Sequence, residues 1–180
     1  MNIPNSLTLL RILVIPMLVF VLVSSLNGKE LIAFVIFLLA AITDMLDGFW
    51  ARRKKQITVF GQLLDPIADK LLITSAFICL VELGVVSAWI VVIIIGREIA
   101  VTGFRALASS KGITIPASIL GKIKMNSETI TVLLLILGEK HLGPYYILSH
   151  IGLWVVVFSA IISAIEYYLK YGSKVLSEDS

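Results

Sequence analysis

Four aspartates in one short run have the spacing most suggestive of chemistry in this sequence. They lie between Thr43 and Lys70, at Asp44, Asp47, Asp65 and Asp69. The first pair is spaced i, i+3 and the second i, i+4, so on helices each pair would share one face. If the two helices form an antiparallel hairpin, all four carboxylates meet at one level. Like charges gathered there need a counter-charge, because they cannot all stay ionised without one.

A divalent metal would supply that counter-charge. Oxygen ligands without His or Cys nearby favour Mg²⁺ or Mn²⁺. Four carboxylates could hold two such ions, the arrangement that stabilises attacking and leaving oxygens in phosphoryl transfer. Gly48 and Ala51 leave room for a flat group beside the first pair, and Arg52 can bind a phosphate through two N–H groups. A set of solvated loop aspartates is the simpler alternative, but it does not explain the helical spacing.

Long apolar segments flank these residues on both sides. The 180 residues are 58% hydrophobic, and the mean hydropathy is +1.00. Several apolar stretches reach the roughly 20 residues that a membrane-spanning helix needs. We therefore predict an all-α, polytopic membrane protein with six transmembrane helices and a single catalytic domain over residues 1–180. The spans are expected near residues 6–25, 31–49, 60–81, 87–108, 116–138 and 147–169.

The basic residues predict how such a protein is oriented. Six spans place both termini on one side, and only Lys29 and Lys140 among the loop lysines and arginines fall on the other side. The positive-inside rule then places the termini and the aspartates in the cytoplasm of a multi-pass cell-membrane protein. Because the basic residues flank apolar spans, the basic pI predicts contact with anionic membrane lipids and no nucleic-acid partner.

A second group of charged residues lies inside the fourth and fifth predicted spans. Its basic members are Arg97, Arg105, Lys122 and Lys124. Ionisable residues within a membrane normally line a cavity or pair with one another. One interpretation is a pocket for a second anion beside the metal site. The other is a set of structural ion pairs, in which Glu98 and Glu128 neutralise these bases or Arg11.

The aspartate run also resembles a known family signature. It reads D-x-x-D-G-x-x-A-R, then eight residues, then G-x-x-x-D-x-x-x-D. This resembles the signature of the CDP-alcohol phosphotransferase family of integral membrane enzymes, with every fixed position filled. The segments PNSLTLLRIL, REI and GKIKMNSE look like the bacterial phosphatidylglycerophosphate synthases within that family. The resemblance implies a six-helix bundle of the family's type that forms a homodimer.

The resemblance also implies a reaction, in which glycerol 3-phosphate attacks CDP-diacylglycerol and CMP leaves. Asp44, Asp47 and Asp65 would be metal ligands, and Asp69 would be the general base and a further ligand. Binding of CDP-diacylglycerol would fall to Asn5, Thr8, Gly48, Ala51, Arg52, Thr58 and Gly61. Binding of the acceptor phosphate would fall to Arg11, Arg97, Arg105, Lys122 and Lys124.

Other functions remain open from the sequence. The same chemistry could use inositol phosphate, serine or phosphatidylglycerol as the acceptor, although a basic pocket favours an acceptor with its own phosphate. A divalent-cation or proton-coupled transporter would also place acids in a helical bundle. Transporters hold such acids near the bilayer midplane, often in inverted repeats. Here the aspartates lie at the ends of predicted spans and no repeat is visible. A lipid-binding subunit without catalysis is a third class.

Overall fold

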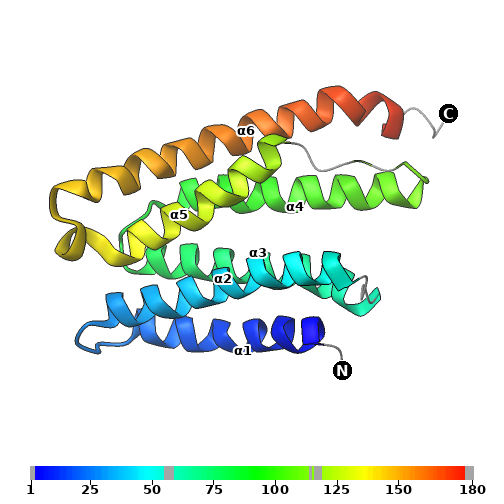
Figure 1. Cartoon of the computed structure of the whole chain (residues 1–180). Coiled ribbons are helices and arrows are strands. Elements are labelled where there is room, and N and C mark those ends of the chain that lie inside the picture. Colours follow the sequence, from blue (N-terminus) through cyan, green and yellow to red (C-terminus); the bar gives the residue numbers. More distant parts are fainter. Residues whose placement is uncertain (1–2, 55–58, 114, 116–118, 177–180) are drawn as a thin grey trace. The chain divides into compact units, whose positions relative to one another are not determined.

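The fold consists of long helices joined by short connections (Figure 1). A computed structural model describes residues 3–54, 59–113, 115 and 119–176, with side chains for 9–43, 67–113, 115, 121, 123–173 and 175. The helices are α1 (Ile3–Val23), α2 (Lys29–Lys54), α3 (Val59–Glu82), α4 (Ala88–Ser110), α5 (Ile119–Leu142), the 3₁₀ helix η1 (Gly143–Tyr146) and α6 (Ile147–Leu176). The prediction of an all-α chain is confirmed over these residues, and each α-helix overlaps one predicted span.

The helix ends follow local backbone chemistry. Gly84 and Gly112 come just after α3 and α4, with φ of 72° and 74°. Glycine adopts this left-handed conformation without the steric penalty that a Cβ brings, so it commonly terminates helices. Gly138 has φ of 66° and ψ of 177° and breaks the last turns of α5. This break lies where the sequence predicts that the fifth span ends.

Two helices continue well beyond the ends of the spans predicted for them. Helix α2 continues to Lys54, beyond the expected end at residue 49, and α6 continues to Leu176, beyond residue 169. The extension of α2 contains Arg52, Arg53 and Lys54, which have good helix propensity and favourable charge for a helix C-terminus. Hydropathy predicts the apolar part of a helix, and the polar extension follows from propensity and charge.

The chain divides into two compact units. Unit 1 comprises Met1–Val86 and Val132–Tyr146, and unit 2 comprises Ser87–Thr131 and Ile147–Ser180. Helix α5 therefore contributes its first half to unit 2 and its second half to unit 1. The single catalytic domain predicted over the whole chain stays a prediction.

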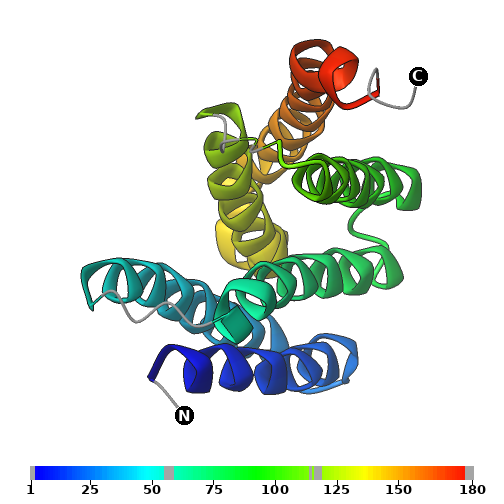
Figure 2. The same cartoon turned by 90° about the vertical axis from the view of Figure 1, so that its right-hand side faces the viewer.

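Unit 1 is organised around α1, which packs against both α2 and α3. Figure 2 shows α1, in dark blue, beneath the other two helices. Its buried side chains include Leu18 of α1, Phe37 of α2 and Phe77 of α3, each fully buried. The start of α1, the end of α2 and the start of α3 lie at the same end of the unit (Figure 1). The helix ends that carry the four aspartates therefore share one end of this unit.

Unit 2 contains α4, the first half of α5, and α6, with α4 packed against α6. A hydrophobic cluster joins Ala108 of α4 and Ile115 of the following connection to Tyr167 and Val175 of α6. The Lys111 ammonium group donates a hydrogen bond to the Val175 carbonyl oxygen at 2.9 Å. This contact ties the connection after α4 to the last turns of α6.

Apolar side chains also cover much of the surface. The exposed residues along α6 include Ile151, Trp154, Val155, Phe158 and Ile162. Within the described part of the chain, one helical stretch, Ile123–Ser173, is long and apolar enough to cross a membrane, and Leu9–Val23 is a shorter apolar helix. An apolar surface of this extent is unfavourable in water and is typical of contact with lipid or with another protein.

Within unit 2, α5 and α6 approach closely at Gly152. A Cβ atom built on Gly152 would lie 2.5 Å from the Thr131 hydroxyl oxygen, and the Thr131 side chain is buried. We expect Gly152→Val to lower the free energy of unfolding by about 1–3 kcal/mol, the usual effect of overpacking. The measurement is the thermal unfolding midpoint of purified protein in detergent.

Gly103→Val is the matched control for this prediction. Gly103 lies within α4, and a Cβ there meets no atom within 4 Å. The control therefore introduces the same valine into a helix, at a position where no neighbouring helix comes close. Equal loss of stability in both variants would show that valine in a helix, and not helix approach, is responsible.

Candidate active site

The four aspartates lie on the helices that the sequence predicts for them. Asp44 and Asp47 are in the second half of α2, and Asp65 and Asp69 are in the first half of α3. Because both segments are helical, each pair lies on one helix face. The side chains of Asp44, Asp47 and Asp65 lie outside the described residues, so the convergence of the four carboxylates stays a prediction.

Asp69 is the aspartate whose surroundings the structure describes. One guanidinium nitrogen of Arg11, on α1, donates a hydrogen bond to Asp69 Oδ1 at 2.8 Å. The Arg11 side chain is buried, whereas the Asp69 side chain is 27% exposed. An arginine inside an apolar helix requires an acidic partner, and Asp69 provides it. The pair also connects the first half of α1 to the aspartate end of α3.

This contact bears on the predicted role of Arg11. The sequence leaves Glu98, Glu128 and the acceptor phosphate as its possible partners, and the structure adds Asp69 to them. The predicted contact with the acceptor phosphate stays a prediction. Arg11 and Asp69 lie at similar distances from the starts of their helices, which are at the same end of unit 1 (Figure 1). Arg11 is eight residues from the start of α1 and Asp69 is ten from the start of α3, about 12 Å and 15 Å along the two axes.

The predicted metal site rests on donors of one chemical type. Carboxylate oxygens without His or Cys suit Mg²⁺ or Mn²⁺, and Asp69 retains an exposed part beside its arginine partner. The described residues contain no group of three or more His, Cys, Asp or Glu that could hold a metal. Three of the four predicted ligands are outside that set, so the donor chemistry fits the prediction and the ligand geometry is untested.

The residues predicted to bind CDP-diacylglycerol are placed by their backbone. Asn5 and Thr8 are in the first turns of α1, Gly48, Ala51 and Arg52 near the end of α2, and Gly61 in the first turn of α3. These segments lie at one end of unit 1 (Figure 1). Thr58 and the side chains of the other six lie outside the described residues.

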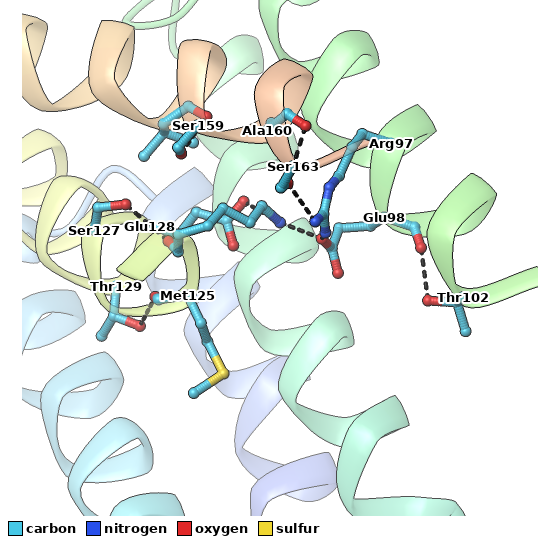
Figure 3. Close-up of polar contacts among 12 residues, drawn as sticks. Arg97, Glu98, Thr102, Met125, Ser127, Glu128, Thr129, Ser159, Ala160 and Ser163 are labelled. Atoms are coloured by element: carbon cyan, nitrogen blue, oxygen red, sulfur yellow. Dashed lines mark hydrogen bonds and ion pairs between the residues drawn. The ribbon is translucent and has the colours of Figure 1, made fainter. Parts of the chain in front are cut away.

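Unit 2 holds a buried network of charged side chains (Figure 3). Arg97 donates to Glu98 Oε1 at 2.5 Å and to the hydroxyl oxygen of Ser163 at 2.5 Å. Lys124 on α5 forms ion pairs with Glu98 and with Glu128, the latter at 2.7 Å. Two cations and two carboxylates give the network no net charge. The structural ion pairs that the sequence left open are therefore present.

Breaking such a network is costly. Removing one partner of a buried ion pair typically destabilises a protein by about 3–5 kcal/mol, because an uncompensated charge stays buried. Ser163 of α6 is the member that sequence reasoning missed, since a lone serine in an apolar segment carries no pattern. It also donates to the Ala160 carbonyl oxygen at 3.1 Å, so its oxygen is held in place to accept from Arg97.

Arg105, another residue predicted to bind the acceptor phosphate, makes no described contact with this network. Arg105 is exposed, and its Nη2 donates to the Ile115 carbonyl oxygen at a long 3.4 Å. The Lys122 side chain is outside the described residues. Of the predicted basic residues, the structure thus brings Arg97 and Lys124 together and leaves Arg105 at the surface.

Comparison with known proteins agrees with the aspartate signature. A family model described as CDP-alcohol phosphatidyltransferase matches residues 1–164. A protein of Bacillus subtilis named CDP-diacylglycerol–glycerol-3-phosphate 3-phosphatidyltransferase is 37% identical, over 94% of each chain. A protein of Rickettsia felis with the same name is 36% identical, over 93% of each chain. The chain belongs to the CDP-alcohol phosphatidyltransferase family.

Proposed function

We propose that the protein transfers the phosphatidyl group of CDP-diacylglycerol to glycerol 3-phosphate, giving phosphatidylglycerophosphate and CMP in phospholipid biosynthesis. The observation that carries the proposal is the match over nearly the whole chain to relatives named for this reaction. The complete aspartate signature, in helical register on α2 and α3, supports it.

The family is generally dependent on divalent metals, and in this chain Asp44, Asp47, Asp65 and Asp69 would hold two Mg²⁺ or Mn²⁺ ions. Bound there, the ions would neutralise the pyrophosphate and stabilise the leaving CMP. Asn5, Thr8, Gly48, Ala51, Arg52, Thr58 and Gly61 would hold the cytidine diphosphate. Arg52 would contact a phosphate through its planar guanidinium, and the two small residues of α2 would let the nucleotide approach the backbone.

The reaction itself is a substitution at phosphorus. The acceptor hydroxyl oxygen bonds to the phosphorus that carries diacylglycerol, and the bond from that phosphorus to the bridging oxygen breaks. CMP departs with the electron pair, and the hydroxyl proton passes to the Asp69 carboxylate. Arg11 would position that carboxylate through its 2.8 Å contact. Positioning and charge neutralisation provide most of the catalysis in phosphoryl transfer.

The location of the protein is proposed on similar grounds. The family is membrane-associated, and each α-helix here has at least 21 residues, about the length of a membrane span. We place both termini and the aspartates on the cytoplasmic side of six spans. This topology puts most of the loop lysines and arginines on the cytoplasmic side, as the positive-inside rule expects. The exposed apolar residues of α6 would then face lipid or a second copy in a homodimer.

The direct test is CMP release by the purified protein supplied with CDP-diacylglycerol and Mg²⁺. We expect rapid release with glycerol 3-phosphate, slow release with inositol phosphate, serine or phosphatidylglycerol, and loss of activity when a chelator removes the metal. Faster CMP release with another alcohol would show that this alcohol, and not glycerol 3-phosphate, is the acceptor. Absence of CMP release, together with cation flux into liposomes, would favour a transporter.

Asp69→Asn tests the proposed base. We expect kcat to fall by about 10²–10⁴, the usual contribution of general base catalysis, while binding of CDP-diacylglycerol stays measurable. Glu82→Gln, at the other end of α3 on an exposed residue, is the matched control and should retain activity. Substantial turnover by Asp69→Asn would remove Asp69 from the role.

Arg11→Gln separates the two roles open to Arg11. If Arg11 positions Asp69, kcat falls by up to about 10²-fold, as for a misplaced catalytic group, and the KM for glycerol 3-phosphate changes little. If Arg11 binds the acceptor phosphate, that KM rises and kcat is largely kept. Arg11→Lys, which retains the charge but not the planar donor group, should recover part of kcat only in the first case.

A further inference from the structure

We propose that Glu98 occupies the place of the acceptor phosphate in unit 2 and must leave it before the acceptor binds. The proposal rests on the proposed function, because it assumes an acceptor that carries a phosphate. Its basis is the arrangement of donors around the Glu98 carboxylate. Arg97 and Lys124 both bind the same oxygen, Glu98 Oε1. Two cations converging on one anionic oxygen also form a site suited to a phosphate oxygen.

Each cation has a second partner that would keep it in place without Glu98. Arg97 also donates to Ser163, and Lys124 also pairs with Glu128 at 2.7 Å. Figure 3 shows Ser163 reaching Arg97 from α6, on the side away from the Glu98 backbone. Departure of the Glu98 side chain would therefore leave two positioned cations and one buried carboxylate, with a net charge of +1.

Exposure distinguishes Glu98 from the other members of the network. Its side chain is 21% exposed, whereas that of Glu128 is 4% exposed and that of Lys124 is 3% exposed. Glu98 is therefore the carboxylate of the network with the larger exposed part, and its outward rotation would open the side from which an anion enters. Glu128 is enclosed, and its function is to hold Lys124.

Arg97 has donor capacity that the carboxylate does not use. The Arg97 side chain is nine-tenths buried, and its Nε has no hydrogen-bond partner among the described residues. A buried N–H group without an acceptor is unfavourable. A phosphate monoester offers three oxygens and a charge of about −1.5 to −2 near neutral pH. It could bind Nε together with the groups that now bind Glu98, which a single carboxylate oxygen does not do.

The test compares Glu98→Gln with Glu128→Gln in the purified protein. Both substitutions remove one negative charge from the same network with almost no change in shape. We expect Glu98→Gln to lower the KM for glycerol 3-phosphate by about tenfold, because one charge-assisted contact no longer has to break. The inhibition constant of inorganic phosphate, competing with glycerol 3-phosphate, should fall by a similar factor. The KM for CDP-diacylglycerol should stay unchanged.

Glu128→Gln should raise the KM for glycerol 3-phosphate, because Lys124 loses the partner that holds it. An unchanged or higher KM in Glu98→Gln would overturn the proposal. So would an equal fall in both variants, which would attribute the effect to net charge and not to occupancy of the site. If Glu98→Gln cannot be purified in folded form, Glu98→Asp provides the test. Its shorter carboxylate should bind both cations less well, so the KM for glycerol 3-phosphate should again fall.

Failure of the proposed function gives a different result. Wild-type protein that releases CMP with another alcohol, but not with glycerol 3-phosphate, would overturn the proposed function and this proposal with it. Wild-type turnover with glycerol 3-phosphate, combined with a KM that Glu98→Gln does not lower, would overturn this proposal alone.

Discussion

Charge buried among apolar helices must be neutralised by charge of the opposite sign, and both units of this protein obey that constraint. An isolated ion in an apolar interior is so unfavourable that it finds a partner or loses its charge. In unit 1 the buried guanidinium of Arg11 pairs with Asp69. In unit 2 two cations and two carboxylates form a neutral network. The charged residues that chemistry needs are the same ones that hold helices together.

The two units meet the constraint with opposite arrangements. In unit 1 the buried member of the pair is the cation Arg11, and the carboxylate of Asp69 is partly exposed. In unit 2 the cations are buried, and the exposed member is the carboxylate of Glu98. The arrangement in unit 1 leaves a carboxylate oxygen accessible, which could act as a metal ligand or as a base. The arrangement in unit 2 presents cations that an incoming anion can reach only by replacing a carboxylate.

The sequence predicted the fold well because the relevant signals are local. Apolar length determines where the six helices lie, and the break in α5 falls at Gly138, where the fifth span is predicted to end. The spacing of Asp44–Asp47 and of Asp65–Asp69 predicts helical faces, and the structure makes both segments helical. Hydropathy missed the extensions of α2 and α6. The extension of α2 follows from helix propensity and charge, whereas that of α6 is held by Val175, which is buried in the hydrophobic cluster of unit 2.

Partners between helices could not be predicted in the same way. Which acid meets Arg11 depends on which helices pack together and at what relative height, and neither is encoded in the spacing along one helix. The sequence offered Glu98 and Glu128 as partners, and packing of α1 on α3 supplies Asp69. Ser163 was missed for the same reason, since its importance comes from lying opposite Arg97 and not from its neighbours in the chain.

The neutral network also bears on the choice of acceptor. While Glu98 is in place, Arg97 and Lys124 have their charge satisfied, so they attract an uncharged alcohol no more strongly than other polar groups would. An acceptor with its own phosphate brings a charge that can replace Glu98 at both cations, and it also brings further oxygens for Arg97. Serine carries a carboxylate but its charge is offset by its ammonium group, so it would gain much less from the exchange. Discrimination then arises because Glu98 must be displaced, and a network with free cations would bind small anions of every kind.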